Sequence, residues 1–220
     1  MKARLKESYD AMADVYAARF TEHDPSVSVR IKYIRQMIQQ LDQDGVSSAR
    51  VLELGCGNGV PATQFLLENE KPRFSVTGND LSSAQITLAR ANLARFKHRI
   101  QLMEGDMLAL TFPEASWDVV TAFYSVFHLP RREQTLLVKN IYSWLRPGGF
   151  LLSNFAGEEV EQEQMDKWLG HEKGWMFWSG WGKDGSLKMM QESGFEVVIG
   201  ELLEDVGDAT FLWVLARKPL

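Results

Sequence analysis

The sequence predicts an α/β protein built on a seven-stranded, mostly parallel sheet with helices on both faces. Apolar runs of strand length alternate with helical segments between residues 51 and 155, the pattern that produces a parallel sheet covered by helices. The run at 118–123 has the composition of a central strand that is buried on both faces. The last two runs, 195–203 and 210–216, are too close for a helical crossover, so we expect an antiparallel C-terminal hairpin.

Composition limits the possible partners. The chain has 220 residues, 45% hydrophobic and 24% charged, which suits one soluble α/β domain over 1–220. A net charge of −5 without a long basic run argues against nucleic acid and anionic membranes as partners. Residues 1–7 are charged and no stretch approaches the ~20 apolar residues of a membrane span, so we expect a cytoplasmic protein, monomer or homodimer. With the single cysteine Cys56 there is no disulfide framework.

The N-terminal part predicts a helical cap over residues 1–45. Apolar residues at helical spacing indicate a first helix over 5–20. Asp24 as N-cap and Pro25 at the first helical position predict the start of a second helix, which extends to Leu41. We expect the first of these helices, over Tyr9–Phe20, to form a mobile lid together with Trp168–Gly182.

The remaining elements follow in order. We expect strands at 51–54, 74–80, 100–104, 118–123 and 150–155, with helices at 61–67, 82–96 and 131–145 between them. We then expect a lid insertion over 156–185, made of a charged surface helix at 158–169 and an irregular segment rich in Gly and Trp at 170–185. Asp184 or Ser186 caps a last helix, which ends at Gly194.

A glycine-rich loop follows the first strand. Gly55, Gly57 and Gly59 permit positive φ and close approach of a ligand, although the same pattern also suits a plain tight turn. A dinucleotide fingerprint would need a third glycine where Val60 stands. Glu53, just before the loop, is poorly placed beside a pyrophosphate and well placed beside an ammonium group.

Three further strand ends carry candidate ligand-binding residues, because ligands bind at the carboxyl ends of parallel strands. Asp80 ends the second strand, 21 residues after Gly59 (80 − 59), and could accept the hydroxyls of a ribose. Asp106 follows the third strand and could cap a turn or accept from an exocyclic amine. The fourth strand ends at Phe123 and leads to His128.

Five motifs occur together in order over residues 50–155. They are Glu53–Gly59, Asp80, Gly105–Met107, Trp117–Val120 and the Leu-Arg-Pro-Gly-Gly turn Leu145–Gly149. Their order and spacing resemble those of class I S-adenosylmethionine (SAM) dependent methyltransferases, which implies a Rossmann-like fold. The segment Tyr9–Tyr16, which reads Tyr-Asp-x-x-Ala-x-x-Tyr, is similar to the N-terminus of the small-molecule group of this family.

The resemblance implies SAM as cofactor and S-adenosylhomocysteine (SAH) as product. It assigns Asp80 to the ribose hydroxyls, Asp106 to the adenine amine and Glu53 to the ammonium group. The full set of implied cofactor residues is Tyr9, Tyr16, Arg30, Glu53, Gly55, Cys56, Gly57, Asp80, Leu81, Asp106, Met107 and Phe123. For the two tyrosines, packing on a helix face is an equal alternative. No metal is implied.

Methyl transfer depends mainly on alignment and on exclusion of water, and a hydroxyl acceptor also benefits from a base. His128 is the candidate base, with a wall or capping residue as the alternative. The candidate acceptor-binding residues are Tyr124, Trp175, Trp178 and Trp181, which could equally form the core of a lid.

The function that we expect is SAM-dependent methylation of a hydroxyl or carboxyl group on a small molecule. An N-methyltransferase, in which Trp faces hold an amine, is an alternative. A SAM-binding regulatory protein without turnover is another. The spacing of the glycines disfavours a nicotinamide dehydrogenase.

Overall fold

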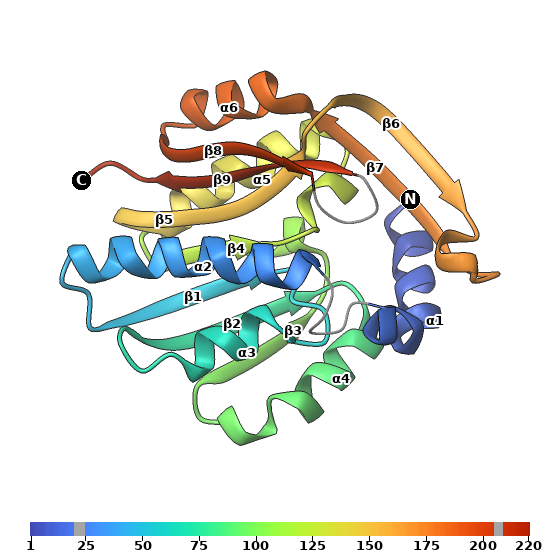
Figure 1. Ribbon diagram of the computed structural model, residues 1–220, viewed down its shortest axis with the longest axis horizontal. Coiled ribbons are helices and arrows are strands. Elements are labelled where there is room, and N and C mark those ends of the chain that lie inside the picture. The colour runs from blue at the N-terminus through green and yellow to red at the C-terminus, as the bar shows by residue number, and fades with distance from the viewer. Residues whose placement is uncertain (20–24, 205–208) are drawn as a thin grey trace.

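The computed structural model describes residues 1–19, 25–204 and 209–220, and its centre is a seven-stranded sheet (Figure 1). The strands are β1 (Ser48–Leu54), β2 (Arg73–Asp80), β3 (Ile100–Glu104), β4 (Trp117–Ala122), β5 (Leu145–Ala156), β8 (Glu196–Glu204) and β9 (Thr210–Arg217). Their order is β3-β2-β1-β4-β5-β9-β8. Strands β1 to β5 are parallel, and β9 is antiparallel to both of its neighbours. The predicted fold class is confirmed.

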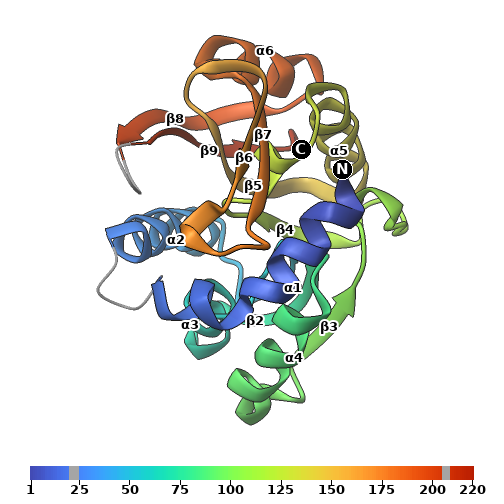
Figure 2. The same ribbon diagram turned by 90° about the vertical axis from the view of Figure 1, so that its right-hand side faces the viewer.

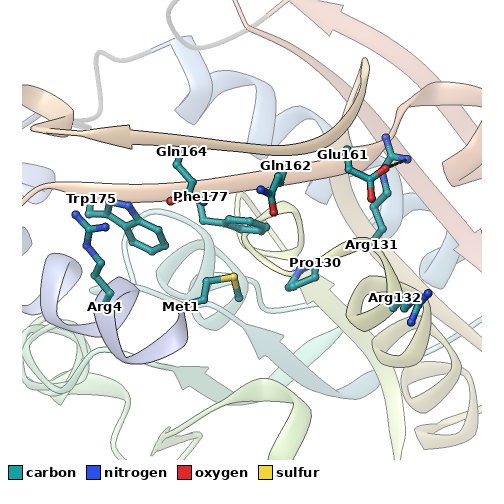
Figure 3. Close-up of a pocket in the computed structure, with 10 residues that line it drawn as sticks. All are labelled: Met1, Arg4, Pro130, Arg131, Arg132, Glu161, Gln162, Gln164, Trp175 and Phe177. Carbon is teal, nitrogen blue, oxygen red and sulfur yellow. Dashed lines mark hydrogen bonds and ion pairs between the residues drawn. The ribbon is translucent and has the colours of Figure 1, made fainter.

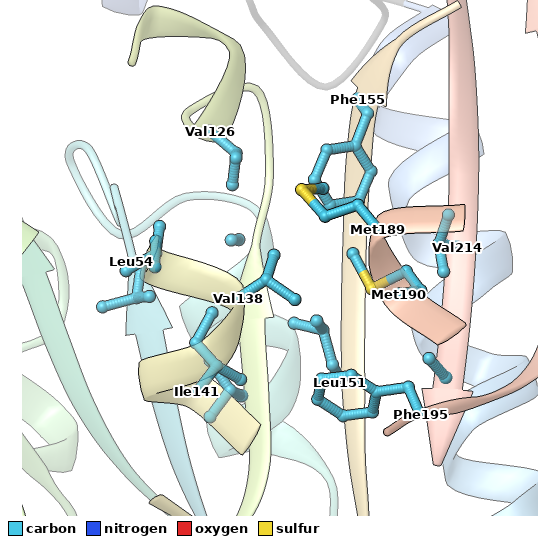
Figure 4. Close-up of a cluster of buried hydrophobic side chains, with 14 of the residues drawn as sticks. Leu54, Val126, Val138, Ile141, Leu151, Phe155, Met189, Met190, Phe195 and Val214 are labelled. Atoms are coloured by element: carbon cyan, nitrogen blue, oxygen red, sulfur yellow. The ribbon is translucent and has the colours of Figure 1, made fainter. Parts of the chain in front are cut away.

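Two hydrophobic clusters hold helices against opposite faces of this sheet. Helices α2 (Pro25–Gln43) and α3 (Ala62–Glu68) contribute to one cluster, and α4 (Ser83–Asn92) contacts β2 and β3. Helices α5 (Arg131–Trp144) and α6 (Gly182–Glu192) contribute to the other, where their side chains meet those of β5 and β9 (Figure 4). The central strand β4 is buried from Val119 to Ala122, as its apolar composition predicts.

Helix α1 (Lys2–Arg19) runs across the ends of the strands and contacts α4 on one side (Figure 2). The predicted N-cap Asp24 lies outside the described residues, as does the last residue of the predicted first helix, Phe20. Single 3-10 turns connect several elements: η1 (Ala94–Phe96), η2 (Met107–Ala109), η3 (Val126–His128) and η4 (Trp168–Gly170). Among the helices of the described residues, none is long and apolar enough to cross a membrane.

The prediction for residues 158–185 is wrong. Strands β6 (Glu159–Asp166) and β7 (Trp175–Trp181) form an antiparallel hairpin instead of a surface helix followed by an irregular segment. Glutamate and glutamine favour helix in isolation, but every residue of β6 except Val160 is exposed, so pairing with β7 decides its conformation. The buried residues of β7 hold the hairpin against α1.

The start of α6 also differs from the prediction. The helix begins at Gly182, and neither Asp184 nor Ser186 caps it. Gly182 has a φ of +65°, and a Cβ atom there would lie 2.9 Å from the backbone nitrogen of Glu159. The close approach of the hairpin therefore fixes the start of the helix, and Asp184 lies in its first turn, where a negative charge is favourable.

Candidate active site

The glycine-rich loop is held by the carboxylate of Asp80. The backbone N–H of Gly57 donates to Asp80 Oδ2 at 2.8 Å, and that of Ser82 donates to Oδ1 at 2.9 Å. Gly55 has a φ of +74°, and a Cβ atom there would lie 2.5 Å from Cβ of Ser125. Burial raises the pKa of Asp80. Each carboxylate oxygen keeps a lone pair that a ribose hydroxyl could use.

Glu53 lies under the loop with only 2% of its surface exposed. The Thr63 hydroxyl donates to Glu53 Oε2 at 2.5 Å. Burial raises the pKa of Glu53 to about 7, although Thr63 and the charge of Arg30 act in the opposite direction. The described residues place no ion-pair partner on this carboxylate, so a ligand ammonium group would suit it.

A small cavity lies above the loop, in front of the ends of β1, β2 and β4. It brings together most of the predicted cofactor residues: Tyr9, Tyr16, Gly55, Gly57, Asp80, Leu81, Asp106, Met107 and Phe123. Cys56 is buried behind the loop against Gly78, and burial raises the pKa of its thiol well above the ordinary value, so the thiol is not a reactive group.

Gln85 also lines this cavity, although it is not among the residues predicted from the sequence. It is 2% exposed, and among the described residues its side-chain amide has no hydrogen-bond partner for either the oxygen or the nitrogen. A polar residue beside Ile86 and Ala89, on the apolar face of α4, is the sequence signal that could have revealed it. An unsatisfied buried amide fits a site for a polar ligand.

Helix α1 covers the cavity and is fixed by polar contacts. Lys2 Nζ lies 2.8 Å from both Asp106 Oδ2 and Glu133 Oε2. Asp10 Oδ1 accepts from the Ser82 hydroxyl at 2.6 Å, at the N-terminus of α4. The covered cavity has a volume of about 90 Å³, whereas ligand pockets usually measure about 300–1,000 Å³. We therefore expect α1 to move when a cofactor enters.

His128 forms a hydrogen-bonded pair with Tyr9. Its Nδ1 lies 2.8 Å from the carbonyl oxygen of Phe177, which can only accept, so Nδ1 carries the proton of the neutral ring. Nε2 therefore accepts from the Tyr9 hydroxyl at 3.0 Å. Burial lowers the pKa of His128 to about 4 and raises that of Tyr9 well above its ordinary value. Both side chains are thus neutral at neutral pH.

A second cavity of about 620 Å³ lies on the other side of this pair, between the hairpin and the C-terminal strands. Tyr9, Tyr16, Tyr124 and His128 line both cavities and form a partition between them. Arg30 lines the larger cavity, with its guanidinium carbon 4.8 Å from the ring centre of Tyr124.

Of the predicted acceptor-binding residues, Tyr124 and Trp178 line this second cavity. Trp175 lines a third cavity of about 610 Å³, between the hairpin, the first turn of α1 and the start of α5, together with Arg4 and Arg131 (Figure 3). Trp181 packs on the Arg131 guanidinium, 4.9 Å from the ring centre. The structure thus separates these four aromatic residues.

Comparison with known proteins identifies the central part of the chain. Residues 51–149 match the family model described as a methyltransferase domain. These residues belong to the class I SAM-dependent methyltransferases. The recognition from sequence is confirmed, and SAM is the cofactor of this domain. The buried Glu53 carboxylate, Asp80 and the unpartnered Gln85 amide fit its ammonium and hydroxyl groups.

Two relatives of the methyltransferase domain act on different acceptors. The chain is 36% identical to 27-O-demethylrifamycin SV methyltransferase of Amycolatopsis mediterranei, over 53% of this chain and 44% of that protein. It is 32% identical to demethylmenaquinone methyltransferase of Lactococcus lactis, over 66% of this chain and 52% of that protein. The chain therefore spans about half the length of these curated relatives.

Solved structures share the fold over nearly the whole chain. The [4+2]-cyclase SpnF has a TM-score of 0.72 at 18% identity and covers 100% of this chain and 97% of its own. The 1,6-didemethyltoxoflavin-N1-methyltransferase of Burkholderia thailandensis has a TM-score of 0.73 at 17% identity, over 99% of this chain and 88% of its own. At this identity the likeness concerns the fold alone.

Proposed function

We propose that the protein transfers the methyl group of SAM to a hydroxyl group of a small molecule. The observation that carries this proposal is the 3.0 Å contact between Tyr9 Oη and His128 Nε2, in the partition between the two cavities. A hydroxyl loses its proton when it is methylated, so a base assists the reaction. A neutral amine or a carboxylate attacks without a base, and the Tyr9–His128 pair therefore favours a hydroxyl acceptor.

The lone pairs on the Tyr9 oxygen and on His128 Nε2 define a route for the proton. SAM supplies a methyl group that its sulfonium activates. His128 Nε2 has one lone pair, which the Tyr9 hydroxyl already occupies, whereas the Tyr9 oxygen can accept a further hydrogen bond. The acceptor hydroxyl would donate to Tyr9. As its oxygen bonds to the methyl carbon, the sulfonium–methyl bond would break with its electron pair left on sulfur, and the hydroxyl proton would pass to Tyr9. The proton of Tyr9 passes to His128 Nε2.

In this proposal residues 1–45 and 156–185 are a cap and a lid insertion of one domain that spans 1–220. Tyr9 belongs to α1, so the proton route is complete only when α1 lies over the cofactor. Closure would exclude water from the reacting groups, which suits a reaction that depends on alignment.

The proposal is tested with SAM labelled on its methyl group and a panel of phenols, alcohols, carboxylic acids and amines. Mass spectrometry of the products should show methyl ethers. A panel in which only amines or only carboxylates become methylated would contradict the proposed function, while methylation of any acceptor would still agree with the methyltransferase domain.

A further inference from the structure

The larger cavity has one aromatic wall built from α1 and the hairpin. The ring centres of Tyr9 and Tyr16 lie 5.7 Å apart, and those of Tyr16 and Trp168 lie 6.0 Å apart. Trp168 and Trp178 continue the wall at 6.5 Å. These distances are typical of aromatic pairs in contact, so the four rings form a continuous surface.

A second aromatic wall comes from β9 and from the loop after β4. Phe211 contacts both Tyr124, at 5.3 Å between ring centres, and Phe127, at 5.4 Å. His128 joins this wall to the first one, because its ring lies 4.8 Å from Phe127 and 6.4 Å from Trp178. All of these rings line the cavity. The base thus lies where the two aromatic surfaces meet.

Among the described residues that line this cavity, only Arg30, Glu158 and Glu163 carry a full charge at neutral pH. The Arg30 guanidinium lies over the ring of Tyr124, and Glu158 and Glu163 are exposed to solvent. The volume of about 620 Å³ falls in the range of pockets for drug-sized ligands, so a single ring would leave much of the cavity unfilled. Aromatic walls of this kind favour a flat ring system, because ring faces and edges attract one another.

On the basis of the proposed function, we propose that the methyl acceptor is a phenol with two or more fused aromatic rings. The ring body lies between the two aromatic walls, and the hydroxyl group points to the Tyr9–His128 pair. The specificity for a flat body comes from Trp178 on the first wall and Phe211 on the second. The carbon skeleton is uncharged.

The test compares 2-naphthol with decahydro-2-naphthol, which has the same carbon skeleton and a hydroxyl group at the same position but is neither flat nor aromatic, and with phenol, which keeps the phenolic hydroxyl. Calorimetry is performed on the protein saturated with SAH. We expect 2-naphthol to bind about tenfold more tightly than its saturated analogue, as stacking against two aromatic walls predicts. Phenol, with one ring, should also bind about tenfold more weakly than 2-naphthol.

Two variants of the aromatic walls and one control variant test whether these walls cause the preference for 2-naphthol. Trp178→Leu and Phe211→Leu should each reduce the preference for 2-naphthol several-fold while SAH affinity stays unchanged, which shows that the fold is intact. Phe96→Leu, far from the cavity, should leave the preference unchanged. Equal binding of the two probes, no binding of either, or a preference that survives both wall variants would overturn the inference. Failure of SAH to bind would instead overturn the proposed function. In that case the binding of 2-naphthol and of decahydro-2-naphthol would be compared on the protein without SAH, which tests the aromatic walls separately.

Discussion

Lys2 forms an ion pair with Asp106 at 2.8 Å, which ties the first turn of α1 to the end of β3. Asp106 is also the residue that the sequence assigns to the adenine amine of the cofactor. Its Oδ1 accepts from the backbone N–H of Leu108 at 3.0 Å, so Oδ2 is the atom for which Lys2 and an amine would compete.

Replacing Lys2 should therefore loosen the cover over the cofactor cavity. In Lys2→Met we expect SAH to associate and dissociate several-fold faster, because one tether of α1 is lost. Salt should accelerate exchange in the wild-type protein more than in the variant, since surface ion pairs are screened. Stopped-flow fluorescence measures both rates. Lys97→Met, an exposed residue away from α1, is the control, and identical rates in all three proteins would contradict a role for this contact.

The Tyr9–His128 pair should control turnover rather than cofactor binding. We expect His128→Ala to lower kcat by about 10²–10⁴-fold. In this variant the KM for SAM should change little. Tyr9→Phe, which keeps the ring and removes the hydroxyl that relays the proton, should also lower kcat strongly. His98→Ala, an exposed histidine, is the control. A Tyr9→Phe enzyme with normal kcat would show that the acceptor reaches His128 directly.

The pH profile offers an independent measure of the same pair. A base must be unprotonated, and the pKa of His128 is about 4. We therefore expect kcat to stay level as the pH falls from 8 to 5, and to decrease only as the pH approaches 4. An exposed histidine would give a decrease near pH 6.5. A decrease at that higher value would contradict the burial of the base.

Glu53 should make the stability of the ligand-free protein depend on pH. Its pKa is raised from 4.5 to about 7, so between these values the folded state holds a proton that the unfolded state has lost. Stability from this group is present below pH 4.5 and declines as the pH rises to 7, by about 3 kcal/mol. Glu53→Gln removes this decline. Urea unfolding at pH 5 and pH 8 measures it, with Glu70→Gln as an exposed control. A constant difference between Glu53→Gln and wild type at both pH values would contradict the burial of the charge.

Gln85 should have opposite effects on stability and on binding. Its buried amide has no hydrogen-bond partner in the described part of the chain, and an unsatisfied group of this kind costs about 1–3 kcal/mol. Gln85→Leu should therefore raise the melting temperature of the free protein and weaken SAH binding. Calorimetry and thermal unfolding test the two effects, and unchanged SAH affinity would remove Gln85 from the cofactor site.

The sequence predicted the sheet and the loop because their signals are local. The glycines after β1 and the apolar run of β4 each identify an element without knowledge of its neighbours. The hairpin has no such signal, since β6 is almost entirely exposed and its conformation depends on β7.

The four predicted acceptor-binding residues do not share one cavity, and this error arises because the sequence did not predict the β6–β7 hairpin. Side chains alternate across a strand, so Trp175 and Trp181 leave β7 on one side and Trp178 on the other. An irregular segment provides no such rule, and the three tryptophans could not be separated. Phe211 was not predicted as a site residue because β9, far away in the chain, brings it to the cavity.

The partition of four rings has a consequence for the order of events in turnover. The cofactor cavity lies under α1, whereas the larger cavity is bounded mainly by the hairpin and β9. We therefore expect a methylated product to leave past the hairpin while α1 stays in place, and SAH to leave after α1 lifts. In that order SAH is the last product released. SAH should then be a competitive inhibitor towards SAM, and the opening of α1 should limit the steady-state rate when the acceptor is abundant.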